Sequence, residues 1–186
     1  MANKVKFNIK NVHYAPKTDD GYDKPIALPG AVSISLEAQG ELSPFYADGI
    51  KYYVASSNSG YEGDLEVALV TDEFREKILK EVMDANKVMF ENAYSNPVAF
   101  ALGFDIDGDD KTTRFWFYNC SATRPGTSSS TTGESKEPTT DTITISCASN
   151  DKGIVRGKTT ADTSKEVFDS WYNEVYTKTD EAGSAE

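Results

Sequence analysis

Few residues of this chain have the types and spacing that catalysis requires. A Ser–His–Asp arrangement would have to use His13, the single histidine, as its base. His13 lies between Val12 and Tyr14 in a strand-like stretch, and no nucleophile motif accompanies it. We therefore interpret His13 as a structural or surface residue and predict no catalytic residue in the chain.

A calcium site is the nearest metal interpretation, because carboxylates alternate through Asp105-x-Asp107-Gly108-Asp109-Asp110. An EF-hand loop needs a glycine at position six and a glutamate at position twelve. Counted from Asp105, the glycine is at position four and Trp116 is at position twelve. The segment suits a hairpin turn better, so we predict no metal and no cofactor.

Two further motifs also lack the spacing of a binding site. Gly60-x-x-Gly63 is not followed by Lys and Ser or Thr, and it precedes a strand, so it is no phosphate loop. Cys120 and Cys147 do not have the spacing of zinc ligands. Each lies in a β-like run, and we interpret them as buried free thiols, with a disulfide between adjacent strands as the alternative.

The charge of the chain is strongly negative. Its 186 residues contain 30 Asp and Glu against 19 Lys and Arg, which gives a net charge of −11. Such a field repels nucleic acid and anionic membranes at contact distance, so binding of DNA as a ligand is disfavoured. No run is long enough to span a bilayer, and the first residues lack the apolar part of a secretory signal. We expect the chain to be made and folded in the cytoplasm.

The densest apolar stretch, Val98 to Arg124, predicts a long β-hairpin. Residues 98–106 and 112–123 are rich in Phe, Trp, Tyr and Ile, and residues 107–111 supply the turn. Arg114-Phe115-Trp116-Phe117-Tyr118 does not alternate, so its aromatic rings point to both faces of the sheet. The domain core covers one face, and a helix, a second sheet or another subunit covers the other. We expect this hairpin to have more apolar area than one chain can cover, so that identical copies shield one another.

Alternating apolar residues predict further antiparallel strands. Val5, Phe7 and Ile9 share one parity and Val12 the other, which predicts a bulge or a strand end near Asn11. The other predicted strands lie around residues 32–38, 65–69 and 143–147, and a strand pair turns at Asp48-Gly49.

One packed α-helix is predicted over about Thr71–Met83. Phe74, Ile78 and Val82 lie four residues apart on one face of it. A second short helix is predicted over residues 163–176, where aromatic residues recur at spacings of three and four. The chain is thus expected to be a mainly β domain over residues 1–176, followed by a disordered acidic tail over residues 177–186.

Three long loops separate these elements. Ala15–Pro29 contains three prolines and no periodicity, so it reads as an extended arm or loop. Pro125–Pro138 is composed mostly of Ser, Thr, Gly, Glu and Pro, and we expect this second loop to be mobile. Tyrosines cluster in Gln39–Gly63 among polar residues. This composition suits a surface that meets another protein, with ordinary strand packing as the equal alternative.

Six segments, in order, resemble the major tail protein of flexible-tailed phages or prophages of Gram-positive bacteria. They are Lys10-Asn11-Val12-His13-Tyr14-Ala15, Pro29-Gly30-Ala31-Val32, Phe45-Tyr46-Ala47-Asp48, Gly60-Tyr61-Glu62-Gly63, Phe100-Ala101-Leu102-Gly103-Phe104 and Arg114-Phe115-Trp116-Phe117-Tyr118-Asn119-Cys120. The resemblance runs from the N-terminus to about Asp141, and the region after Asn150 resembles the pattern least.

The resemblance implies a non-enzymatic, structural tail tube subunit with an antiparallel β-sandwich or barrel-like fold, one helix and long loops. Such subunits form hexameric rings that stack into the conduit for DNA ejection, in a virion tail assembled in the host cytoplasm. Implied partners are further copies of the chain, a tape measure protein and a tail terminator, with DNA passing through the lumen without specific binding and no membrane. Stacked rings join head to tail, and loops at 17–29, 39–63 and 125–138 are candidates for ordering by neighbouring subunits.

Acidic side chains that line such a lumen would offer phosphates no counter-charge, so DNA would slide through it. The alternatives are a carbohydrate-binding or adhesive β-sandwich, whose surface aromatics stack on sugars, and a small hydrolase with scattered carboxylates.

Overall fold

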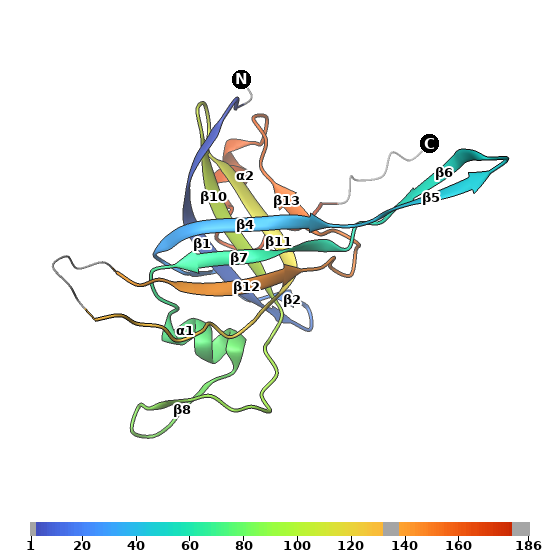
Figure 1. The fold of residues 1–186 in the computed structure, drawn as a ribbon. Helices are drawn as coiled ribbons and strands as arrows, with labels where there is room; N and C mark the ends of the chain where they lie inside the picture. The colour runs from blue at the N-terminus through green and yellow to red at the C-terminus, as the bar shows by residue number, and fades with distance from the viewer. Residues whose placement is uncertain (1–2, 132–137, 180–186) are drawn as a thin grey trace.

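The structure, a computed structural model, describes residues 3–131 and 138–179 and is mainly β and antiparallel, as predicted (Figure 1). Its strands are β1 (Lys6–Thr18), β2 (Gly21–Tyr22), β3 (Ile26–Ala27), β4 (Ala31–Gln39), β5 (Leu42–Ala47), β6 (Ile50–Ser56), β7 (Gly60–Val67), β8 (Val82–Met83), β9 (Met89–Phe90), β10 (Phe100–Gly108), β11 (Thr113–Ala122), β12 (Asp141–Cys147) and β13 (Arg156–Lys158). The main sheet has the order β2-β1-β10-β11-β12-β7-β4, with β13 also paired to β11 and β3 to β1.

Strand β11 joins two layers of this sheet. Its first half pairs with β13 and its last residues, from Cys120, pair with β12. Between the halves Asn119 has φ +46°, and the register with β10 shifts between Phe100 and Leu102. A bulge of this kind bends a strand and lets it turn from one layer into another. The layer of β4, β7 and β12 therefore crosses in front of the layer of β1, β10 and β11 (Figure 1).

The predicted aromatic hairpin is confirmed as β10 and β11, and its rings do point to both faces. Phe104 and Phe117 are buried in the main core between the layers, and the partly buried Phe115 packs against it. Trp116 and Tyr118 belong to a second cluster on the opposite face. Trp116, Phe117 and Tyr118 are at most 3% exposed. The expectation that one chain cannot cover the rings of this hairpin is therefore wrong for Trp116, Phe117 and Tyr118, which the chain itself buries.

The cover over the second face is a C-terminal strap, residues 163–178. It contains helix α2 (Lys165–Ser170), shorter than predicted and capped by Ser164, whose Oγ accepts the Val167 N–H at 3.3 Å. Turns follow the helix and bring Trp171 onto the second cluster. The Trp116 indole N–H donates to the Trp171 carbonyl at 3.2 Å, and the Tyr118 hydroxyl donates to the Tyr176 carbonyl at 2.6 Å.

The bulge predicted near Asn11 is present, because Asn11 has φ +53° and the register with β10 shifts between Lys10 and His13. The loop predicted over Ala15–Pro29 is largely wrong. Strand β1 continues through Ala15 and Pro16, which pair with Ala101 and Phe100, and β2 and β3 follow. These pairings come from distant strands, so the local lack of periodicity did not reveal them.

The helix predicted over Thr71–Met83 is shorter. It consists of α1 (Asp72–Phe74), which continues as a π-helical turn over Arg75–Leu79. Phe74, Ile78 and Leu79 are buried as expected. Lys80 ends the helix in the left-handed conformation at φ +60°, so Val82 leaves the apolar face and lies exposed in β8.

The remaining predicted loops fall partly outside the described residues. In Pro125–Pro138, residues 125–131 form neither helix nor strand, and 132–137 lie outside the described part. The predicted tail is described only over residues 177–179, which are exposed, and residues 180–186 lie outside the described part.

Replacing Trp171 by alanine tests whether the strap belongs to the folded core. Its side chain is 3% exposed, and loss of a buried aromatic ring lowers the free energy of unfolding by about 3–5 kcal/mol. Chemical denaturation followed by fluorescence measures the change. Tyr94, at 92% exposure, is the matched control, and Tyr94→Ala should change stability by less than about 0.5 kcal/mol. Equal effects of the two substitutions would show that the strap does not pack on β11.

Candidate interaction surfaces

His13 lies in a polar cluster under the strap and not beside a nucleophile. Its ring stacks on Tyr172 with centroids 4.1 Å apart, and its Nδ1 bonds the Asn11 carbonyl at 2.8 Å. The Tyr172 hydroxyl donates to Asp105 at 2.6 Å, and Arg114 Nε lies 3.5 Å from the same carboxylate oxygen. Burial, followed by the neighbouring Asp105, raises the pKa of Tyr172, so the hydroxyl stays protonated as a donor. The cluster ties the strap to β1, β10 and β11.

The carboxylates considered for calcium do not converge. Asp105 is buried and points to the strap. Asp107 lies 2.6 Å from Lys10 Nζ, which lowers the pKa of its carboxyl. Asp109 accepts the Lys4 backbone N–H at 2.8 Å, which lowers its pKa as well. Each of these three carboxylates therefore has a different protein partner. Within the described ranges, no group of three or more His, Cys, Asp or Glu side chains is arranged to hold a metal ion.

Cys120 and Cys147 are directly opposite each other on β11 and β12, and both are buried free thiols, as predicted. Their sulfur atoms are 2.7 Å apart. Burial raises the pKa of the Cys120 thiol well above its ordinary value. The thiolate that reacts with electrophiles is therefore disfavoured in the folded chain.

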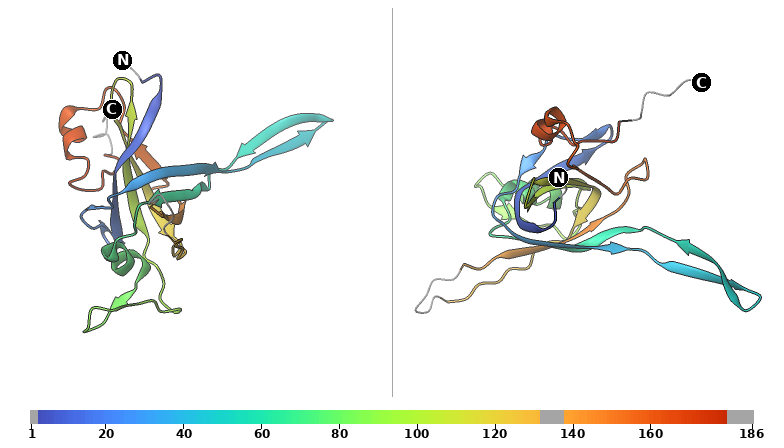
Figure 2. Two further views of the ribbon diagram at one scale, coloured as in Figure 1. Left: turned by 60° about the vertical axis from the view of Figure 1, so that its left-hand side comes forward. Right: turned by 90° about the horizontal axis from the view of Figure 1, so that it is seen from above.

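The first candidate surface is the hairpin of β5 and β6, which projects away from the body of the protein in every view (Figures 1 and 2). Its turn at Asp48-Gly49, predicted from the sequence, has φ +52° and +76°, as a tight hairpin turn requires. Its large apolar side chains are between 39% and 72% exposed: Leu42, Phe45, Tyr46, Ile50, Tyr52, Tyr53 and Val54. Contiguous exposed apolar residues of this kind mark a surface that another molecule covers.

The second candidate surface is an acidic face on the β4–β7–β12 layer. Glu62, Asp64 and Glu66 share the outer face of β7, because Leu65 and Val67 point into the core. Their cross-strand neighbours are Glu37, Ser35 and Ser33 on β4 and Ser146, Thr144 and Thr142 on β12. These three strands contain no Lys or Arg. The face is therefore composed of carboxylates and hydroxyls.

Hydroxyl groups fix part of this face. Glu66 accepts hydrogen bonds from Thr140 at 2.6 Å and Ser33 at 2.9 Å, and Asp64 accepts one from Thr144 at 2.8 Å. The bonds from Thr140 and Ser33 lower the pKa of Glu66, so its charge persists into mildly acidic solution. By contrast, Glu37 and Glu62 are directly opposed like charges, an arrangement that costs stability.

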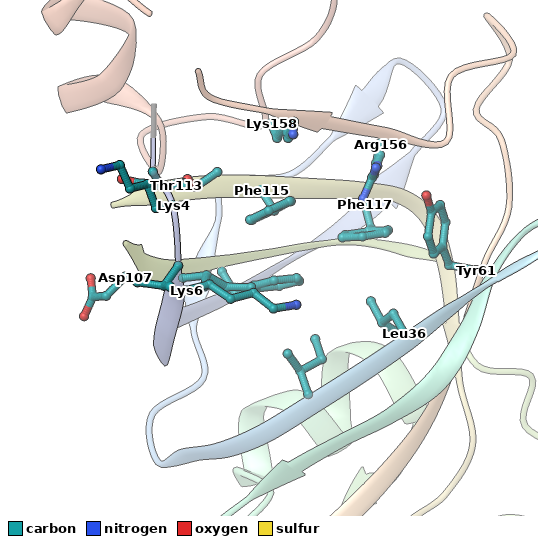
Figure 3. A pocket seen from close by; sticks show the side chains of 15 residues that line it. Lys4, Lys6, Leu36, Tyr61, Asp107, Thr113, Phe115, Phe117, Arg156 and Lys158 are labelled. Carbon is teal, nitrogen blue, oxygen red and sulfur yellow. Dashed lines mark hydrogen bonds between the residues drawn. The ribbon is translucent and has the colours of Figure 1, made fainter. Parts of the chain in front are cut away.

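The third candidate surface is a groove of about 550 Å³ between the two layers (Figure 3). Phe115 and Phe117 lie along β11 within it, Leu36 lies on the opposite wall, and Arg156 and Lys158 lie on the β13 side. Phe104 stacks on both phenylalanines, with centroids 5.2 and 5.7 Å apart. Lys4 and Lys6 from the start of the chain complete a basic rim.

No known family model matches this chain, and no curated protein matches it either. Among the described residues, none of the helices is long and apolar enough to cross a membrane.

The sequence predicted one of these three surfaces but not the other two. Clustered tyrosines in Gln39–Gly63 correctly indicated exposed aromatics. The acidic face was missed, although the alternation of Glu62, Asp64 and Glu66 with buried Leu65 and Val67 carried the signal. The groove had no local signal, because its lining comes from β1, β4, β7, β10, β11 and β13.

The buried thiols predict how the protein reacts with iodoacetamide. In the folded chain neither Cys120 nor Cys147 should be alkylated on a timescale of minutes, because burial hinders access to both thiols and raises the pKa of the Cys120 thiol. In guanidinium both should react, and mass spectrometry counts the added groups. Rapid double alkylation of the native chain would contradict the burial. If the unfolded chain takes no label and its mass is lower by two hydrogens, the two cysteines form a disulfide and the assignment of free thiols is wrong.

Proposed function

We propose that this chain is the self-assembling major subunit of a phage tail tube, whose stacked rings form a conduit for DNA. The observation that carries the proposal is the projecting β5–β6 hairpin. Seven large apolar side chains on it are uncovered, although the same chain buries Trp116, Phe117 and Tyr118 of the aromatic strand β11. Only another molecule can cover an apolar arm that extends beyond its own domain.

The hairpin has enough apolar surface to drive association. Full burial of one large apolar side chain contributes roughly 1.5–3 kcal/mol. The loss of translational and rotational freedom on association costs about 4–15 kcal/mol. Burial of most of the seven exposed side chains offsets that cost, whereas one or two would not. In a closed ring, the free energies of several such contacts add to one another.

The acidic face supports a role as the lining of the conduit. It lies on the outer side of the β4–β7–β12 layer, and Glu37, Glu62 and Asp64 are exposed on it. Carboxylates repel DNA phosphates, so a wall made of this face lets DNA slide without binding. Opposed Glu37 and Glu62 destabilise the isolated domain, and local costs of this kind are typical of functional surfaces.

Assembly of the purified chain tests the proposal. The wild-type protein should form rings or tubes in negative-stain electron micrographs as its concentration rises. Phe45→Ser combined with Tyr52→Ser and Tyr53→Ser should raise the concentration needed for assembly by at least about tenfold, because these rings are interface anchors. Circular dichroism should show an unchanged body, since all three side chains lie outside the core.

Tyr94→Ser is the matched control, because it removes an exposed ring outside the hairpin. This variant should assemble like the wild type. A wild-type chain that stays monomeric at every concentration would overturn the proposal. A monomer that binds a glycan column through the hairpin tyrosines would support the carbohydrate-binding alternative, and turnover of a substrate would support the hydrolase.

Charge reversal on the acidic face tests its role as the lining. Glu37→Lys with Glu62→Lys and Asp64→Lys should leave assembly intact, yet the tubes should bind DNA in low salt and release it as salt rises. In an infectious particle the same changes should slow ejection most at low ionic strength. The corresponding Gln and Asn variants, which remove charge without reversing it, serve as the control. Unchanged DNA binding and ejection in the lysine variant would place these residues elsewhere in the assembly.

A further inference from the structure

Three openings meet around strand β13, and basic side chains line all of them. The groove of about 550 Å³ lies on one side of β13 (Figure 3). A second opening, of about 250 Å³, lies between residues 111–113 and 158–161, and a third, of about 370 Å³, lies between β13 and the strap. Lys158 lines all three. We call the basic lining residues of the three openings the β13 basic patch: Lys4, Lys6, Lys111, Arg156, Lys158 and Lys178.

Carboxylates do not balance this patch. Among the described lining residues of the three openings, Asp107 is the only carboxylate, and it lies 2.6 Å from Lys10 Nζ. Asp109 is occupied at the hairpin turn, where it accepts the Lys4 backbone N–H at 2.8 Å. Within residues 3–131 and 138–179, none of the six patch residues forms an ion pair. The carboxylates on and beside the strap line none of the openings: Asp162, Glu166, Asp169 and Glu174. In a chain whose net charge is −11, this patch favours a negatively charged occupant.

Residues 180–186 have the charge that the patch lacks. They follow Thr179 directly and lie outside the described residues. Their carboxylates are Asp180, Glu181 and Glu186, and they include no Lys or Arg, so their net charge is −3. The other four residues are small, so no bulky side chain hinders the approach of the carboxylates to a charged surface. We call residues 180–186 the acidic segment.

The acidic segment is attached to the chain at the patch itself. Lys178 and Thr179 line the third opening together with Arg156 and Lys158. Seven extended residues span at most about 25 Å, so the segment reaches the patch without rearrangement of the body. A short tether also gives an effective concentration on the order of millimolar. In dilute solution the chain's own segment therefore competes better for the patch than the same segment of another copy.

We infer that the acidic segment docks on the β13 basic patch of its own chain and covers its charge. The carboxylates of Asp180, Glu181 and Glu186 face the ammonium and guanidinium groups of the patch. One exposed ion pair favours a bound form by only roughly 1.5- to 5-fold, so the three carboxylates act together. The contact is reversible and sensitive to salt, and it keeps polyanions off the patch. This inference goes beyond the proposed function and does not depend on assembly.

Energy transfer within the monomer tests the inference. The donors are Trp116 and Trp171, the two tryptophans of the chain, and Trp171 lines the third opening. The acceptor is a dansyl group on Ser184→Cys, and mass spectrometry confirms that the chain carries one label, because the native thiols are buried. Transfer is measured below any concentration at which the wild type associates. It should fall at least about twofold between low salt and about 1 M salt, where charges are screened within about 3 Å.

Charge variants distinguish this contact from general screening. The patch variant carries Arg156→Glu with Lys158→Glu. The segment variant carries Asp180→Asn with Glu181→Gln and Glu186→Gln, and it leaves the described body unaltered. Each variant should lower transfer at low salt to the value that the wild type has at high salt. A charge-swapped chain, which combines the patch variant with Asp180→Lys, Glu181→Lys and Glu186→Lys, should restore high transfer because the two surfaces are again opposite in charge.

The control for the patch variant is Lys24→Glu with Lys87→Glu, which makes the same change of charge at exposed residues outside the three openings. It should show the transfer of the wild type. Thermal unfolding of each variant checks that the body stays folded.

Binding of a fluorescent single-stranded DNA oligonucleotide is the second measurement. At low salt the segment variant should bind at least about threefold more tightly than the wild type, because no segment then competes for the patch. Its matched control is Asp19→Asn with Asp20→Asn and Asp23→Asn, which removes the same charge at exposed residues outside the openings. This control should change the affinity by less than about twofold.

Each outcome decides for or against the docked segment. Loss of transfer in both variants, with recovery in the charge-swapped chain, supports the inference. Transfer that ignores salt and both variants overturns it, and so does equal DNA affinity of the segment variant and its control. Transfer that rises with protein concentration also overturns it, because another copy then supplies the segment. None of these results bears on tube assembly, which electron microscopy tests separately.

Discussion

The structure depends on one constraint, which is that strand β11 carries large aromatic rings on both of its faces. A strand of this kind is stable only between two covers. Phe115 and Phe117 obtain theirs from the β4–β7–β12 layer, which the bulge at Asn119 turns back across the hairpin. Trp116 and Tyr118 obtain theirs from the strap, which two side-chain hydrogen bonds to its carbonyls hold in place. The strap is short and weakly helical, and its position comes from this packing more than from helix propensity.

Local patterns were sufficient to predict most strands, since alternation at Val32–Ala38 and the change of parity at Asn11 are properties of neighbouring residues. Features that depend on distant partners were not predictable in this way. Pro16 belongs to a strand because Phe100 pairs with it, and Val82 is exposed because Lys80 adopts a left-handed conformation. The sequence predicted that a helix, a sheet or another subunit covers Trp116. Only the position of Trp171 in the fold shows that the C-terminal strap is this cover. The groove was not predictable either, because its lining residues come from six strands that are far apart in the sequence.

The charges of the chain are sorted by surface, which composition alone does not reveal. Carboxylates gather on the outer face of β7 and its neighbours, while four basic residues gather at the mouth of the groove. Random placement of 30 acidic and 19 basic residues would mix them as ion pairs over the whole surface. Segregated charge costs stability through opposed pairs such as Glu37 and Glu62, and it gives each surface a preference for a different partner. A wall that repels phosphate and a rim that attracts carboxylate are compatible in one molecule only when they lie on separate surfaces.

The chain covers one of its hairpins and leaves another uncovered, and this contrast suits the proposed subunit, which would fold alone and then associate. The central aromatic residues of the β10–β11 hairpin, Phe104, Trp116, Phe117 and Tyr118, are buried within the chain itself. Within residues 3–131 and 138–179 no third strand pairs with the β5–β6 hairpin, and an isolated pair of strands is only marginally stable in water. In the assembly that we propose, a partner would both cover the rings of this hairpin and rigidify it, and part of the binding free energy would be used for that ordering. In the proposed tube, association would be moderate for one contact and strong when several contacts close together, which would favour complete rings over small oligomers.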